Sequence, residues 1–408
     1  MNKSQIELAA WMQRLADTVV LQPAFGLFDL PGIFQFGNPD YFVPDTTLRE
    51  LDEMLSELGT SMQMSQKAFR TEAVASIVSN LVAKVKWDKQ IWKSWIVNVK
   101  AKPVTKNTTY VSLSGITLKS KSPLTLGPFK VFRLPSHRKA LFGKYPKLQG
   151  VQRKRFEEFV QGSEYLLSCS VEGRDTEFSE NLALLNLSEF SSIIHFMVGS
   201  SRSIKNIELF EIVRRSQKRL TLSQNQGKFG ITRPDLENQD IKLSRFFLNK
   251  KLGNDKIWLL MERKNRSQME DAIILAVKWV GKAAADQDLN RAFVQCVFAI
   301  EALLVRQPEF ITPSIAQQIR EGCAFLLQRS PEKRLQIDSD IPKVYKIRSQ
   351  IVHGHDSPAS SADVSKIFTI ARSLIYHIIN HREFSRWSKP DDLADWIKKY
   401  KYNARKRP

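Results

Sequence analysis

Two side chains suited to phosphate chemistry stand five residues apart in the last part of this 408-residue chain. Arg348 is a permanent cation, and His353 can take up or release a proton near pH 7. A guanidinium group stabilises charge that develops on a phosphate, and an imidazole moves the proton that such a reaction transfers. The pair therefore predicts phosphate chemistry, provided that the fold brings the two side chains together.

An expected helix carries both residues and ends just after them. Its apolar stripe is formed by Val344, Ile347 and Ile351. Gly354 supplies the left-handed residue at which such a helix stops. Five residues along an ideal helix rotate a side chain by ~140°, so the arginine and the histidine do not share one face. Their convergence needs a helix that ends near the histidine, the reach of the arginine, or a second subunit.

The run KVYKIRSQIVHGHD, residues 343–356, resembles the signature of HEPN domains, in which four residues separate an arginine from a histidine. The fuller pattern from Tyr345 to Gly354 is similar to the Apea-like branch of this family. Two upstream segments, 293–305 and 314–327, resemble helices of the family in their order and spacing. The resemblance covers roughly the last third of the chain.

The resemblance implies a function as well as a helical bundle. Active members of the family are metal-independent ribonucleases in which the arginine and histidine of two subunits meet across a homodimer interface. Carried over to this chain, Arg348 would hold the phosphate oxygens and His353 would act as acid or base, with no cofactor. RNA supplies its own nucleophile, the 2′-hydroxyl. The implied setting is stress response or phage defence.

The sequence also leaves a second interpretation open. Many active members have Asn, Asp or His directly after the arginine, where this chain has Ser349. A hydroxyl hydrogen-bonds a phosphate more weakly and without charge. The alternative is therefore a catalytically inactive HEPN-like protein that binds RNA or dimerises, with Arg348 and His353 as a helix-end ion pair or cap. Glu301 and His355 are further candidate supporting residues; Glu301 pairs with a buried arginine such as Arg348 or is simply exposed.

Composition restricts the partners. The chain has 62 Lys and Arg against 42 Asp and Glu, a formal net charge of +20. Such an excess favours polyanions, with nucleic acid first and an anionic membrane surface second.

The cysteines Cys169, Cys296 and Cys323 are widely spaced and predict reduced thiols rather than disulfides or a zinc site. No signal peptide or membrane span is evident, so we expect a cytoplasmic protein with RNA and no membrane as partners.

Hydrophobic patterning predicts an α+β fold. We expect a mainly helical region over 1–104, a mixed α/β region over 105–258, a HEPN-like helical bundle over 259–390 and a basic tail over 391–408. Within the bundle, Ser267 with Glu270 and Ser360 with Asp363 form capping boxes ahead of apolar runs.

A second candidate RNA-binding segment lies near residue 90, where lysines alternate with tryptophans. Aromatic faces stack on unpaired bases while ammonium groups hold the phosphate backbone. The alternative is a buried stripe of Trp87, Ile91 and Trp95 with lysines on its solvated flank. The candidate residues are Lys86, Trp87, Lys89, Trp92 and Lys93. No metal site is predicted, because neither His353 with His355 nor His377 with His381 has a second group of ligands or the glutamate of a zinc-protease helix.

Overall fold

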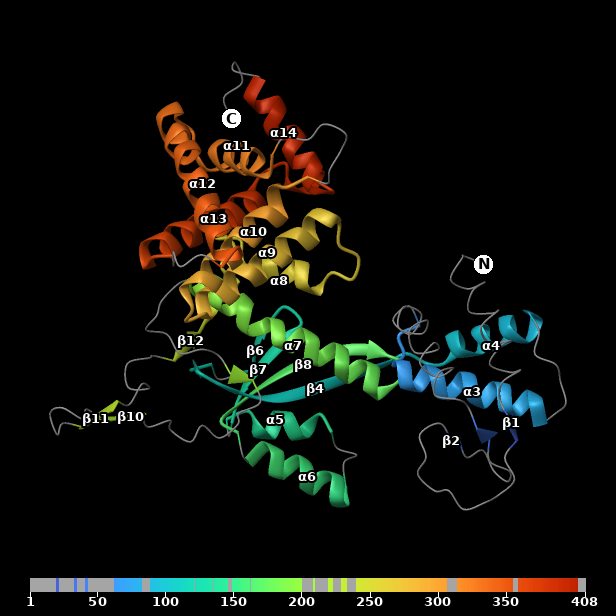
Figure 1. Cartoon of the computed structure of the whole chain (residues 1–408). Helices are drawn as coiled ribbons and strands as arrows, with labels where there is room; N and C mark the ends of the chain where they lie inside the picture. Colours follow the sequence, from blue (N-terminus) through green and yellow to red (C-terminus); the bar gives the residue numbers. More distant parts are fainter. Residues whose placement is uncertain are drawn as a thin grey trace. The chain divides into compact units, whose positions relative to one another are not determined.

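The computed structural model of the chain divides into two compact units (Figure 1). One comprises Met1–Thr109 with Ser170–Leu185, and the other comprises Tyr110–Cys169 with Asn186–Pro408. The structure describes residues 20–21, 33–34, 41–42, 62–82, 89–120, 122–134, 136–145, 149–161, 163–199, 208–209, 219–222, 229–232, 240–306, 314–354 and 359–402. The fold is α+β, as predicted: a small sheet belongs to the first half of the chain and the C-terminal region is helical.

In the first unit, two helices and a short strand group are described. Helix α3 spans Gln66–Val82 and α4 spans Lys89–Ala101. The strands are β1 (Val20–Leu21), β2 (Ile33–Phe34) and β3 (Tyr41–Phe42), and they pair antiparallel in the order β1-β3-β2. Arg174 joins the backbone of this unit, since its Nη1 donates to the Met62 carbonyl at 2.6 Å and its Nη2 to the Lys100 carbonyl at 2.8 Å.

The main sheet has the strand order β6-β7-β8-β4-β9. Antiparallel pairing joins β6 to β7, β7 to β8, and β4 to β9. Two smaller pairs accompany it: β5 runs parallel to β12, and β10 is antiparallel to β11. The bounds are β4 Thr105–Ser114, β5 Ile116–Leu118, β6 Leu124–Leu126, β7 Phe129–Arg133, β8 Tyr165–Gly173, β9 Glu208–Leu209, β10 Arg219–Leu222, β11 Phe229–Thr232 and β12 Ile241–Leu243.

Strand β7 contributes to two separate apolar layers because its side chains alternate between the faces of the sheet. Phe129 packs edge-on against Phe190 of helix α7 (Thr176–Val198), with ring centroids 5.3 Å apart, and lies 6.1 Å from Trp258. Phe132 instead belongs to a cluster with helices α5 (Arg138–Gly143) and α6 (Gly150–Gln161). The buried members of this cluster are Phe132, Leu134, Leu141, Val160 and Leu166.

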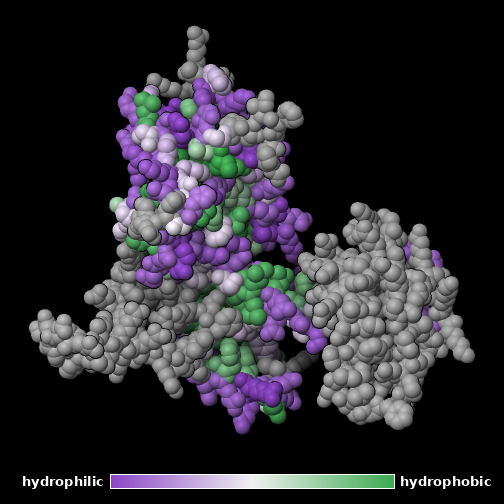
Figure 2. All heavy atoms as spheres, viewed as in Figure 1, coloured by the Kyte–Doolittle hydropathy of each residue, from purple (hydrophilic) through white to green (hydrophobic). Residues whose placement is uncertain are grey.

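The C-terminal region is the helical bundle that the sequence predicts. Helix α10 lies between α9 and α13, while α11 packs on α12 and α13. The outer surface of the bundle is mainly hydrophilic in Figure 2, with hydrophobic residues scattered among polar ones. The helices are η1 Arg245–Leu248, α8 Asn254–Glu262, α9 Gln268–Ala285, α10 Leu289–Leu304, α11 Ile315–Leu327, α12 Pro331–Val352, α13 Ser361–Asn380, η2 Phe384–Arg386 and α14 Pro390–Tyr402.

Local signals in this region match the predicted helix ends. Ser267 and Ser360 both form complete capping boxes, and Gly354 has φ +73° just after α12. Residues 391–402, expected as part of a basic tail, belong to α14, whose Leu393 and Ile397 are buried. An alternation of apolar and charged residues at helical spacing allows this segment to pack although it is basic.

Helix α7 has the length and mean hydropathy, 1.2, of a membrane span. Several of its apolar side chains are covered by protein, since Phe190, Ile193, Ile194 and Phe196 are fully buried, whereas Leu185 is 60% exposed. Arg372 of α13 also donates to the Phe196 and Met197 carbonyls, at 2.9 and 2.6 Å. Such burial is characteristic of a helix at the centre of a core.

The closest approach between α7 and α9 depends on Gly281. A Cβ atom there would lie 1.8 Å from the Ser192 carbonyl oxygen, far inside van der Waals contact. We predict that Gly281→Ala lowers the free energy of unfolding by about 1–3 kcal/mol, because a packed backbone must move to admit the methyl group. Urea unfolding followed by circular dichroism measures this change.

Gly143→Ala is the matched control. Gly143 ends α5, and a Cβ atom there would meet nothing within 4 Å. Its effect should stay within about 1 kcal/mol, since only backbone entropy changes. Equal effects of the two substitutions would show that α7 and α9 do not approach as closely as described.

Candidate functional site

The predicted arginine joins two other polar side chains where α12 lies beside α10. Tyr345 and Arg348 stand three residues apart on α12, and Glu301 is on α10. The Tyr345 hydroxyl donates a hydrogen bond to Glu301 Oε1 at 2.8 Å. Arg348 Nε forms an ion pair with the same oxygen at 4.0 Å. The pairing of Glu301 with Arg348, one of two possibilities left open by the sequence, is therefore present.

Burial strengthens these contacts. The side chains of Arg348 and Glu301 are 31% and 21% exposed. Desolvation by burial, followed by the nearby Glu301 carboxylate, raises the pKa of Tyr345 above its ordinary range, so the hydroxyl remains a donor. Arg348 Nε is buried and makes no hydrogen bond within the described part of the chain. The guanidinium thus lies near a carboxylate, and the rest of the side chain is still partly exposed.

His353 occupies the C-cap of α12, immediately after Val352. Its backbone N–H donates to the Ser349 carbonyl at 3.0 Å, and its side chain is exposed, as is that of Ser349. No contact between His353 and Arg348 is found among the described residues. Within one chain, Arg348 and His353 are therefore not in contact. This agrees with the ideal-helix expectation that the two side chains do not share one face. His355 lies outside the described residues.

Tyr345 was not singled out as a functional residue from the sequence, although it belongs to the run that resembles the family. Its spacing carried the signal: residues three apart on a helix are neighbours, so Tyr345 and Arg348 can reach one facing carboxylate. The apolar residues of α10 around Glu301 are a second indication, because a carboxylate in such surroundings requires polar partners.

The structure describes only part of the second RNA-binding candidate. Lys86 and Trp87 lie outside the described residues. Lys89, Trp92 and Lys93 belong to α4, where Lys93 is exposed. On the same helix Trp95 is buried and packs against Phe69 with ring centroids 5.2 Å apart, as in the alternative of a buried stripe.

Other reactive side chains in the described regions serve packing. His381 stacks on Trp387 at 4.9 Å, and burial lowers the pKa of both His377 and His381. Burial raises the pKa of Cys296 and Cys323 to about 12, so neither is a thiolate at neutral pH. No group of three His, Cys, Asp or Glu that could hold a metal ion is found where side chains are described.

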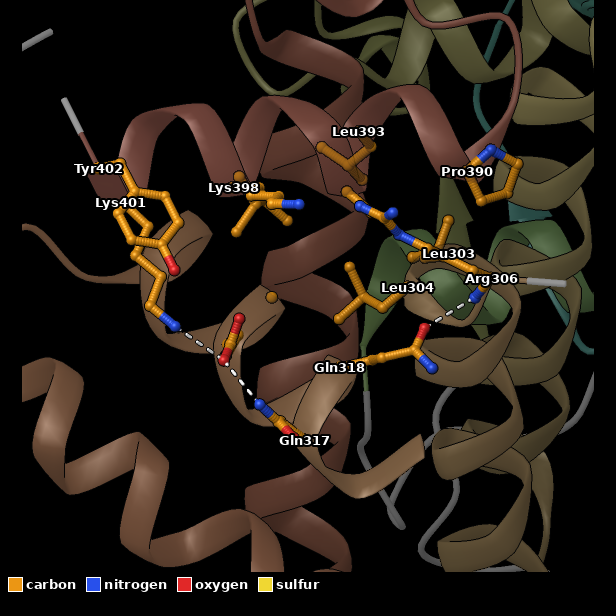
Figure 3. A pocket seen from close by; sticks show the side chains of 14 residues that line it. Leu303, Leu304, Arg306, Gln317, Gln318, Pro390, Leu393, Lys398, Lys401 and Tyr402 are labelled. Carbon is orange, nitrogen blue, oxygen red and sulfur yellow. Dashed lines mark hydrogen bonds and ion pairs between the residues drawn. The ribbon is translucent and has the colours of Figure 1, made fainter. Parts of the chain in front are cut away.

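A cavity of about 510 Å³ lies between α10, α11 and α14 (Figure 3). Its apolar floor includes Leu303, Leu304 and Leu393. The polar side chains at its rim already bind one another: Lys401 Nζ donates to Glu321 at 2.9 Å, and Gln317 donates to the same oxygen at 3.2 Å. None of the described lining residues is a histidine or a thiol, and the carboxylate of Glu321 is already held by Lys401 and Gln317.

A second cavity, of about 440 Å³, contains His195 of α7 beside Asp286 and Gln295. Asp286 accepts from Arg291 Nη2 at 2.9 Å and from Gln295 Nε2 at 3.2 Å. Burial lowers the pKa of His195 to about 4. The imidazole is therefore neutral at pH 7 and cannot act there as an acid.

This depressed pKa predicts an acid-sensitive fold. Between the ordinary histidine pKa of about 6.5 and the folded value of about 4, the unfolded chain binds a proton that the native chain does not. Stability that is present above pH 6.5 is therefore lost as the pH falls. From pH 7 to pH 5, wild type should lose about 2 kcal/mol more than His195→Gln in urea unfolding. Parallel losses in the two proteins would contradict a buried neutral His195.

Comparison with known protein families, with curated proteins and with solved structures finds no match for this chain.

The contact between Tyr345 and Glu301 can be tested by removing one oxygen. Tyr345→Phe should lower the free energy of unfolding by about 1.5–3 kcal/mol, because it removes a hydrogen bond to a charged acceptor. Tyr402→Phe provides the control, since Tyr402 is 75% exposed and should change stability by less than about 0.5 kcal/mol. A Tyr345→Phe protein as stable as wild type would exclude this hydrogen bond in solution.

Proposed function

We propose that the chain is a metal-independent endoribonuclease of the HEPN type, with Arg348 and His353 as its catalytic residues. The observation that carries the proposal is the placement of Arg348: its guanidinium lies at ion-pair distance from Glu301, and its side chain remains 31% exposed. An arginine so placed suits a phosphate oxygen, which accepts charge-assisted hydrogen bonds. The exposed His353 at the end of the same helix supplies a proton carrier.

The chemistry uses only groups of RNA and of the protein. Neutral His353 accepts the proton of the 2′-hydroxyl as its oxygen attacks the adjacent phosphorus. Arg348 stabilises the added negative charge on the non-bridging oxygens. The bond from phosphorus to the 5′-oxygen breaks, and that oxygen takes a proton from water. The products are a 2′,3′-cyclic phosphate and a 5′-hydroxyl end.

A homodimer is part of this proposal, because one chain holds the two groups apart. Arg348 is directed to Glu301 on α10, whereas His353 is exposed beyond the last residue of α12. A two-fold axis near this helix end would place the arginine of one copy beside the histidine of the other. The contacts with Glu301 and Tyr345 would then position the arginine.

The decisive experiment incubates purified protein with a mixed RNA pool in excess EDTA, beside His353→Ala and Arg348→Ala. Wild type should cut the RNA, and each variant should be at least about 100-fold slower, since a positioned acid or base contributes at least that much. Lys333→Ala is the control: Lys333 is exposed in the first turn of α12 and should cut like wild type. Circular dichroism verifies equal folding of all four proteins.

Mixing the two inactive variants tests the shared site. Each mixed dimer would hold one intact arginine–histidine pair, so activity should return to about one quarter of wild type after subunit exchange. RNA bound but left intact by wild type would instead support the inactive, RNA-binding alternative. Cleavage that persists in both variants would exclude Arg348 and His353 as the catalytic pair.

A further inference from the structure

The positive charge of the chain is concentrated away from the helical bundle. Residues 110–156 contain 11 lysines and arginines and no aspartate or glutamate. Residues 259–390, which form most of the bundle, contain 19 lysines and arginines against 14 aspartates and glutamates. A polyanion is held by cations that lack carboxylate partners, so the bundle is the weaker candidate for its main contact.

The acid-free segment includes β7, α5 and the first part of α6, and several cations of this part surround one aromatic cluster. The Lys144 ammonium lies 5.2 Å from the centre of the Phe132 ring. Two guanidinium carbons lie over Phe142, that of Arg138 at 5.5 Å and that of Arg153 at 4.4 Å. Phe132 and Phe142 pack in the same cluster, so these cations are neighbours although they come from different elements.

These cations are poorly neutralised. Within the described residues, Lys130, Arg138 and Lys144 have no carboxylate within ion-pair distance, and only Arg153 pairs with Glu157, at 2.7 Å. Lys130 and Lys144 are both exposed. Partial burial of the ammonium group, followed by repulsion from Lys130, lowers the pKa of Lys144. A bound anion would relieve this repulsion.

We propose that Lys130, Arg138, Lys144 and Arg153 form a binding face for single-stranded RNA on β7, α5 and α6. We name it the α5–α6 cationic face. In Figure 2 the helices α5 and α6, at the bottom of the view, carry mainly hydrophilic residues with smaller hydrophobic areas between them. Ammonium groups hold phosphates, and guanidinium groups offer planar surfaces on which unpaired bases stack. The choice of RNA rests on the proposed function; the anion-binding character rests on the cations.

The test measures RNA binding separately from RNA cutting. Every protein carries His353→Ala, so that a short fluorescein-labelled single-stranded RNA stays intact, and anisotropy is followed across a salt series in EDTA. The triple variant Lys130→Gln, Arg138→Gln, Lys144→Gln should bind at least about tenfold more weakly near 0.1 M salt. The slope of log affinity against log salt should fall by about 2, since each lost phosphate contact removes about 0.7.

The control is a second triple variant with the same loss of charge, Lys242→Gln, Lys251→Gln, Lys333→Gln. All three lysines are exposed and lie outside the α5–α6 cationic face. It should bind RNA like its parent. Equal binding by both triple variants and the parent, or equal weakening of both, would overturn the proposal. Tighter binding of the parent to DNA of the same sequence, or to anionic lipid vesicles, than to RNA would also overturn it.

The outcomes separate this inference from the proposed function. Loss of RNA binding in the first triple variant, together with no cleavage by wild type, would uphold the RNA-binding face and remove the nuclease. Cleavage by wild type that requires Arg348 and His353, together with unchanged RNA binding in the triple variant, would uphold the nuclease and remove the face.

Discussion

The second unit depends on the burial of both faces of strand β7. Phe129 directs one face to α7 and to Trp258 of the bundle, and Phe132 directs the other to α5 and α6. Since alternate residues of a strand point to opposite sides, one five-residue strand connects two apolar layers. Fully burying each phenylalanine stabilises the fold by about 1.5–3 kcal/mol. The close approach of Gly281 to Ser192 then joins α7 to the bundle, so the sheet and the candidate site share one core.

Within that core, Glu301 imposes a second constraint. A carboxylate that is largely withdrawn from water destabilises the fold unless donors satisfy it. Tyr345 donates a hydrogen bond to it, Arg348 lies at ion-pair distance, and both come from one side of α12. The same contact therefore sets the rotation of α12 against α10 and fixes the arginine.

The sequence predicted the helical bundle and its local signals well, because these depend on neighbouring residues. The capping boxes at Ser267 and Ser360 and the left-handed Gly354 require only a few adjacent positions. Contacts between distant parts of the chain could not be predicted in this way. That Tyr345 rather than Ser349 faces Glu301 depends on how α12 rotates against α10, which no local pattern fixes. The basic charge of residues 391–402 predicts a tail, whereas the helical spacing of Leu393 and Ile397 allows these residues to pack as α14.

The distribution of charge suggests a division of labour between binding and chemistry. A nuclease site requires few groups at defined positions, and additional cations beside it would hold substrate and product equally. Affinity for a polyanion, by contrast, grows with the number of unpaired cations and tolerates imprecise placement. In this chain the precise contacts occur at Glu301, Tyr345 and Arg348, while the unpaired cations gather on the α5–α6 cationic face. The net charge of +20 therefore provides information about where RNA would be held, and little about where it would be cut.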